Sequence, residues 1–108
     1  MSGCIGPTGD RTEAVLVVES RYDAERTFVV RFEEGDIVSF QERVTLDPDE
    51  SVRVEDDLFR GADRADVFVE VLVGTEQETV HETAVEAGRD EYRLLVGPDG
   101  IDVVNGDP

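Results

Sequence analysis

The sequence contains no lysine, and all ten of its basic residues are arginine. Lysine is normally among the commonest residues of soluble proteins. Here its absence accompanies 27 Asp and Glu residues and a formal net charge of −17 over 108 residues. At about 0.15 M salt the Debye length is about 8 Å and neighbouring carboxylates repel, whereas at about 1 M it is about 3 Å and most repulsion is screened. We therefore interpret the composition as that of a protein from an extreme halophile.

Several other absences exclude partners and chemistries. The arginines form no run, so the clustered positive charge that binds nucleic-acid phosphates is missing. No stretch approaches the roughly 18 apolar residues of a membrane-spanning helix. His81 is the only histidine, so neither a histidine metal cluster nor a catalytic triad with a second histidine can be built, and we interpret it as an ordinary strand residue. Ser20, Ser39 and Ser51 lack the Gly-x-Ser-x-Gly context of a nucleophile. We therefore expect no enzyme.

The single cysteine, Cys4, lies in an informative place. It follows Ser2 and Gly3 and precedes a Gly/Pro/Thr stretch over residues 5–10. This small-small-Cys triplet resembles the end of a prokaryotic lipoprotein signal, the lipobox, without the basic and apolar segments that precede it in such signals. The resemblance implies that Cys4 is lipidated, that residues 1–12 form a tether, and that the membrane is contacted only through a lipid anchor. A cytoplasmic N-terminus with an incidental cysteine is the alternative.

From residue 13 onward, alternation of apolar and polar residues is the dominant pattern, which is typical of strands. Turn residues separate the apolar segments, most clearly over 47–51 and 97–100. Glu42 interrupts the apolar parity of its segment and indicates a bulge or a bend. A helix over 51–58 is the main local alternative. Strands are expected over residues 13–19, 26–33, 37–46, 52–58, 66–73, 79–86, 92–96 and 101–104.

Seven or eight short strands, with no helix long enough to cover a sheet, must pack sheet on sheet. We predict an all-β protein: an immunoglobulin-like antiparallel β-sandwich over residues 13–104 with a C-terminal tail over 105–108. We expect a monomer. The expected core residues are Leu16, Val18, Phe28, Val30, Phe32, Phe40, Leu46, Val52, Phe68, Val71, Val85, Leu94 and Val96.

The segment over residues 44–52, VTLDPDESV, resembles the strand–turn–strand core of prokaryotic extracellular immunoglobulin-like domains of the CARDB (cell-adhesion-related) type. Members often carry Leu-x-Pro-Gly-Glu-Ser there, and Asp49 stands where the family usually has glycine. Residues 34–38 and 67–71 also lie where such domains place a hairpin and a core strand. The resemblance implies a small haloarchaeal surface lipoprotein, and the family has no shared catalytic residues to carry over.

Calcium is the one cofactor that the sequence allows us to consider. Loop carboxylates offer the hard oxygen ligands that calcium prefers, although none matches the spacing of an EF-hand. A hydrated acidic surface is the alternative interpretation. The candidate ligands are Asp47, Asp49 and Glu50, then Asp56 and Asp57, then Asp99 and Asp102.

The function expected from these observations is that of a non-enzymatic, cell-surface immunoglobulin-like module. It would bind or space other surface components, either a surface protein or a glycan, at the extracellular face of the cytoplasmic membrane. The alternative is a soluble accessory domain, or a carrier of calcium or another small ligand, located in the cytoplasm. Because sandwich folds support unrelated functions, the fold alone does not choose between them.

Overall fold

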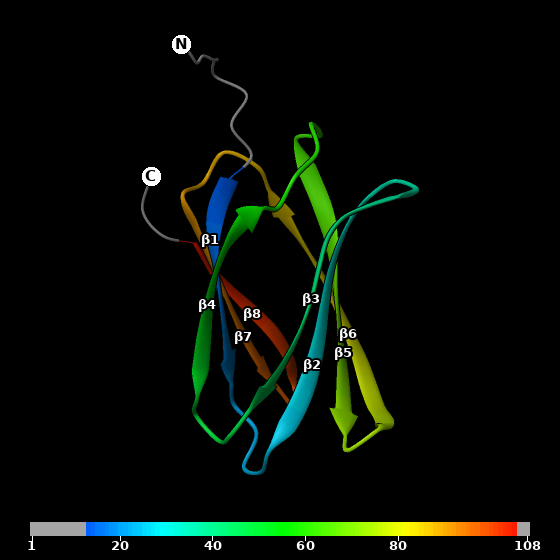
Figure 1. Ribbon diagram of the computed structural model, residues 1–108, viewed down its shortest axis with the longest axis vertical. Coiled ribbons are helices and arrows are strands. Elements are labelled where there is room, and N and C mark those ends of the chain that lie inside the picture. The colour runs from blue at the N-terminus through cyan, green and yellow to red at the C-terminus, as the bar shows by residue number, and fades with distance from the viewer. Residues whose placement is uncertain (1–12, 106–108) are drawn as a thin grey trace.

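The computed structural model describes residues 13–105, which form eight β-strands and no helix (Figure 1). In chain order the strands are β1 (Glu13–Ser20), β2 (Arg26–Glu34), β3 (Ile37–Leu46), β4 (Ser51–Asp57), β5 (Arg64–Val73), β6 (Glu76–Glu86), β7 (Glu91–Gly97) and β8 (Gly100–Asn105). The segment over 51–57 is therefore a strand and not the alternative helix. Its Val52 and Val54 alternate with exposed polar residues, which is the period of a half-buried strand.

The strands form two four-stranded sheets that pack face to face, so the predicted β-sandwich is confirmed (Figure 1). One sheet has the order β4-β1-β7-β8 and the other has the order β3-β2-β5-β6. The pairs β1–β4 and β2–β5 lie in opposite sheets, so the chain crosses between the layers as in Greek-key and immunoglobulin-like sandwiches.

One pairing adds a feature to the predicted antiparallel arrangement, because β1 and β7 are parallel. The cause is the direction of the chain. Each strand runs opposite to the one before it, so two odd-numbered strands are parallel wherever they become neighbours. Every other pairing joins an odd-numbered and an even-numbered strand and is antiparallel.

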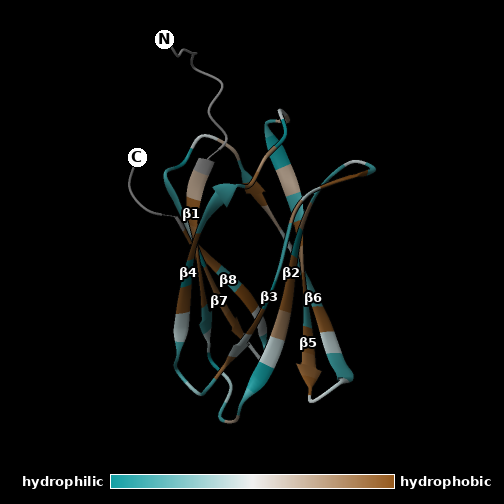
Figure 2. Cartoon of the chain, viewed as in Figure 1, coloured by the Kyte–Doolittle hydropathy of each residue, from teal (hydrophilic) through white to brown (hydrophobic). Residues whose placement is uncertain are grey.

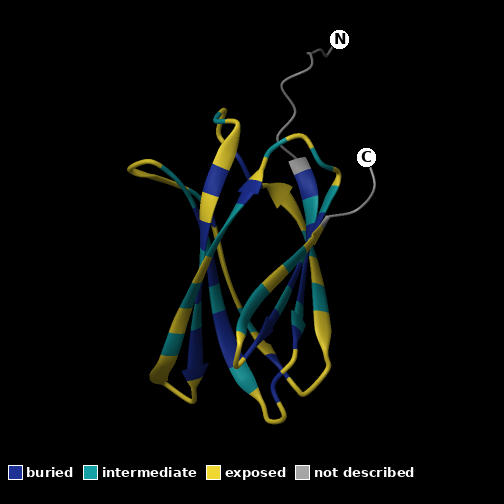
Figure 3. Ribbon diagram, turned by 180° about the vertical axis from the view of Figure 1, so that it is seen from behind, coloured by how far each residue is buried: buried dark blue, intermediate teal, exposed yellow. Residues whose placement is uncertain are grey.

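The core lies between the sheets and is built from alternate residues of each strand (Figures 2 and 3). Apolar and hydrophilic residues alternate along the central strands, and buried residues alternate there with more exposed ones. Eleven of the thirteen expected core residues are buried; the exceptions are Val52, which is partly buried against the core, and Phe68. The largest fully buried side chains include Tyr92, Phe28, Phe32, Leu16, Leu58 and Leu94.

Phe68 is a correction to the expected core. In β5 the residues Val67, Val69 and Val71 are completely buried, and Phe68 lies on the opposite, outer face, where Arg31 covers its ring at 5.3 Å from the centroid. An uninterrupted apolar run such as 67–69 does not reveal by itself which parity faces the core. The flat guanidinium shields one side of the ring and so makes its outward position tolerable.

The bulge lies three residues before Glu42, the residue at which the sequence indicated it. Phe32 pairs with Phe40 and Glu33 pairs with Val38, which leaves Ser39 as the extra residue of β3. The Ser39 hydroxyl donates a hydrogen bond of 2.7 Å to the carbonyl oxygen of Leu58, so the bulge turns a polar side chain toward the loop after β4.

Tyr92 closes the connection between β6 and β7 from inside the sandwich. Its hydroxyl donates to the carbonyl oxygen of Glu86 at 2.6 Å and accepts from the backbone NH of Arg89 at 3.2 Å. The side chain is 1% exposed, so its ring is buried while its hydroxyl satisfies two backbone groups of the turn. This arrangement resembles the tyrosine corner of immunoglobulin-like sandwiches.

Candidate functional site

The two ends of the sandwich differ in what they carry. β1 begins and β8 ends at the same end, which also bears the turns over residues 35–36 and 87–90 (Figure 1). The opposite end bears the loops over 21–25, 47–50, 74–75 and 98–99. We call this second end the loop end. Cys4 and the expected tether over 1–12 lie outside the described residues.

Five of the candidate calcium ligands lie at the loop end or near it, whereas Asp56 and Asp57 lie at the other end of the sandwich, where β4 ends. Asp47, Asp49 and Glu50 form the β3–β4 turn and Asp99 lies in the β7–β8 turn, whereas Asp102 is on β8, and all five are exposed. Within residues 13–105, no group of three or more His, Cys, Asp or Glu side chains is arranged to hold a metal ion. The structure therefore does not gather these carboxylates into one described cluster.

The β3–β4 turn is instead closed by its own carboxylate. Glu50 Oε1 accepts from the backbone NH of Asp47 at 2.8 Å, and the Glu50 NH donates to the Asp47 carbonyl oxygen at 3.0 Å. Asp49 has a φ of 63°, which is the left-handed conformation that glycine adopts most easily and that Asp tolerates. This geometry explains how Asp49 can occupy a turn position that glycine favours.

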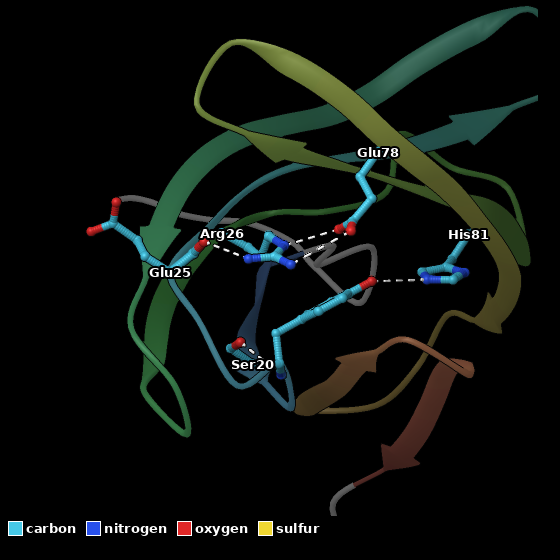
Figure 4. A network of polar contacts seen from close by, with 6 residues as sticks. Ser20, Glu25, Arg26, Glu78 and His81 are labelled. Atoms are coloured by element: carbon cyan, nitrogen blue, oxygen red, sulfur yellow. Dashed lines mark hydrogen bonds and ion pairs between the residues drawn. The ribbon is translucent and has the colours of Figure 1, made fainter.

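A group of polar residues near the loop end connects the loop after β1 with the strands β2 and β6 (Figure 4). Tyr22 lies in the loop after β1, Arg26 begins β2, and Glu78 and His81 lie on β6. Arg26 Nε donates to Glu78 Oε1 at 2.9 Å, and the guanidinium lies 5.0 Å from the centroid of the Tyr22 ring. The Tyr22 hydroxyl lies 3.4 Å from Nε2 of His81. We call these four residues the tyrosine–histidine cluster.

The electrostatics of this cluster favour a neutral phenol beside a charged guanidinium. Burial, and then the negative charge of Glu78, raise the pKa of Tyr22. The hydrogen bond from Arg26 to Glu78 raises the pKa of the guanidinium. The ring of Tyr22 is 5% exposed and packs 6.0 Å from the ring of Phe28, centroid to centroid. The cluster therefore attaches β6 to the loop after β1 through packing and charge.

Sequence reasoning assigned His81 to an ordinary strand position and did not foresee its contact with Tyr22. The alternation of inward-facing and outward-facing residues along β6 could have shown that His81 faces inward. Thr79, His81 and Thr83 share the inner face with the buried Val85, as their pairing with Val71, Val69 and Val67 shows. Because β6 is an edge strand, the inward position of His81 remains near the margin of the sandwich and accessible to a partner from the neighbouring loop.

A hollow in the described part of the surface lies between β6 and β8, the edge strands of opposite sheets. It has a volume of about 410 Å³. Val85, Ile101 and Val103 contribute apolar surface, whereas Arg64, Arg89 and Glu86 place charges around it. A smaller hollow of about 140 Å³ lies on the outer face beside Phe68. Among the described residues β6 and β8 are the edge strands of their sheets, so the first hollow lies between two strand edges.

Comparisons with known proteins give no relative for this chain: no protein-family model, curated protein or solved structure matches it. Across the described residues there is no helix whose length and hydropathy would allow it to cross a membrane.

Proposed function

We propose that this chain is a non-enzymatic, cell-surface immunoglobulin-like module of a halophile, of the CARDB type, that binds or spaces other surface components. The proposal combines the Cys4 triplet, the acidic composition and the sandwich. It assigns the protein to the outer face of the cytoplasmic membrane, where a lipid on Cys4 would hold it.

The observation that carries this proposal is the position of the strand ends. β1 begins at the end of the sandwich opposite to the loop end (Figure 1). A chain anchored before residue 13 would therefore direct its loop end away from the membrane. The strands of six to eleven residues between the two ends would hold those loops roughly 20–35 Å from the point of attachment.

The acidic surface supports the proposed salt environment. Arg26, Arg31 and Arg93 are each held by a neighbouring carboxylate in the described structure. The chain has 27 acidic and ten basic residues, so most carboxylates have no arginine with which to pair one to one. Concentrated salt would screen the repulsion among them and allow the compact state to persist.

The test is to express the protein in a halophilic host from its natural gene, with any codons that precede Met1. We expect the native protein in the membrane fraction and accessible to protease added to intact cells. Cys4→Ser should release it into the soluble fraction while leaving its circular dichroism unchanged. A native protein that stays soluble and protected inside intact cells would overturn the proposal.

The second candidate is a soluble accessory domain or small-ligand carrier, and the hollow between β6 and β8 is the observation that favours it. A volume of about 410 Å³ is in the range of small-molecule sites, although its surroundings carry Arg64, Arg89 and Glu86 and it is shared between two strand edges. Release of a bound small molecule on denaturing protein purified from its host would favour this candidate.

A further inference from the structure

The strand β8 differs from the other three edges of the two sheets. Exposed edges pair with other chains unless charges, bulges or prolines protect them. The described part of β8 contains one charged residue, Asp102, set between Ile101 and Val103. The other edges are protected: β6 by Glu76, Glu78, Glu82 and Glu86, β4 by Arg53, Glu55, Asp56 and Asp57, and β3 by the bulge at Ser39 with Glu42 and Arg43.

The register of the β7–β8 hairpin shows which backbone groups of β8 point outward. The hairpin closes on the pair Gly97–Gly100 across a two-residue turn, so this pair is hydrogen-bonded and every second pair after it is also hydrogen-bonded. The NH and C=O groups of Ile101, Val103 and Asn105 therefore point away from β7. Among the described residues, no strand lies on that side within the sheet.

The space beside this edge is suited to an added strand. The hollow between β6 and β8 lies on the inner side of the edge, where alternate side chains of an added strand would point. Ile101 and Val103 are partly buried and pack against the core, so they extend its apolar surface into the hollow. Val104, on the outer face, is 47% exposed.

We propose that the β8 edge pairs antiparallel with β8 of a second copy of this chain, about a two-fold axis at Val103. In this register Val103 forms a hydrogen-bonded pair with its own copy, and Ile101 forms one with Asn105 of the second copy. These are the residues whose backbone groups point outward. On the inner face the two Val103 side chains adjoin at the axis, so the same patch serves both copies, as an isologous interface requires.

The same register keeps like charges apart. Asp102 of each copy lies opposite Val104 of the other, so the only carboxylate of the strand does not face itself. Directly opposed like charges destabilise strand pairs, and this arrangement avoids them. Val104 is also the neighbour of Arg93 on β7, which places a cation one strand beyond each Asp102 of the second copy.

The charge and size of the interface set its strength. Two copies that each carry a formal charge of −17 repel at low salt, and the acidic strands β6 lie beside the new interface. Pairing through one short strand buries an area at the low end for specific complexes, below about 1,200 Å², which is typical of weak and transient contacts. Association should therefore be weak and should strengthen as salt screens the repulsion.

The antiparallel arrangement has a geometric consequence that deepens the proposed function and rests on it. Because β8 of the second copy runs in the opposite direction, the ends at which β1 begins lie on opposite sides of the pair. Two anchored copies would thus project from two facing surfaces, and the partner of the module would be its own counterpart on another membrane.

The test is sedimentation velocity of the full chain over a range of concentrations up to about 1 mM, at which weak pairs form, in about 2 M KCl, where charges are screened. We expect a dimer whose population rises with salt, with slowed exchange of the Ile101 and Val103 amide protons. Val104→Asp places a carboxylate opposite Asp102 at two equivalent pairs and should weaken dimerisation by about two- to thirtyfold, whereas Val104→Arg should strengthen it.

Val80→Asp is the matched control, because Val80 has the same 47% exposure on the other sheet and should leave dimerisation unchanged. Val103→Pro should abolish dimerisation without touching the β7–β8 hydrogen bonds; if it does not fold, the Val104 variants decide.

Equal effects of Val104→Asp and Val80→Asp, or a monomer throughout, would overturn the proposal. If the protein is a monomer and the Ile101 and Val103 amide protons exchange slowly, the chain's own terminal residues cover the β8 edge. If the protein is a monomer and these amide protons exchange fast, the edge is left for a different protein to bind. A dimer that never reaches the cell surface would refute only the proposed function.

Discussion

Removing the hydroxyl of Tyr92 tests whether the β6–β7 connection is held from inside the sandwich. Tyr92→Phe retains the buried ring and deletes the hydrogen bonds to the Glu86 carbonyl oxygen and from the Arg89 NH. Each such bond contributes about 0.5–1.5 kcal/mol, so we expect the free energy of unfolding to fall by about 1–3 kcal/mol. For a domain of this size, a loss of about 2 kcal/mol lowers Tm by about 10 °C.

The chain supplies a matched control for this measurement. Tyr22 is 5% exposed and its ring is likewise buried, but within the described residues its hydroxyl has only the 3.4 Å contact with His81. Tyr22→Phe should therefore cost less than about 0.5 kcal/mol, because a contact of this length is a weak hydrogen bond. Thermal unfolding followed by circular dichroism in concentrated KCl gives both values. Equal losses in the two variants would refute the role assigned to the Tyr92 hydroxyl.

Three further predictions concern pH, salt and calcium. Burial raises the pKa of Tyr92 and of Tyr22 above the unfolded value of 10.0, so the unfolded chain loses phenolic protons first. The stability contributed by the neutral phenols is complete below about pH 10 and is lost as pH rises through the folded pKa values. Because lysine is absent, phenolate absorbance and folding stability should change together over this pH range. A Tyr22→Phe, Tyr92→Phe double variant whose stability still falls with rising pH over the same range would contradict this. Dialysis from about 2 M to about 0.1 M KCl should lower Tm by more than about 10 °C, since the formal charge of −17 is then poorly screened; an unchanged Tm refutes the halophilic interpretation. If the β3–β4 turn binds calcium, calorimetric titration with CaCl₂ in concentrated KCl gives heat that Asp49→Asn removes, and the absence of heat from the native protein removes the hypothesis.

The alternation of apolar residues was enough to predict the strands and most of the core. Phe28, Val30 and Phe32 alternate with polar or less buried neighbours, so their inward parity follows from the local pattern. The turn over 47–50 was equally clear, because proline and aspartate have the backbone preferences that tight turns require. These features depend on neighbours in the sequence, which is why the sequence alone reveals them.

Features that depend on distant residues could not be predicted in this way. The parallel pairing of β1 with β7 joins residues more than seventy positions apart, and no local pattern encodes it. Phe68 lies within an apolar run whose parity is ambiguous, and only the position of Arg31 on the neighbouring strand shows why it can face outward. The Tyr22–His81 contact and the unprotected edge of β8 likewise require the strand order.

The position of β1 between β4 and β7 affects how the chain becomes folded during synthesis. The hairpins β2–β3 and β5–β6 can form as soon as their own residues leave the ribosome. β1 can then pair with β4, but its other edge must wait for β7, more than seventy residues later. Closing such a large loop is slow, and until it closes the first sheet has an open flank. Loss of β7 and β8 would thus halve this sheet and leave the inner edge of β1 without a partner among the described strands.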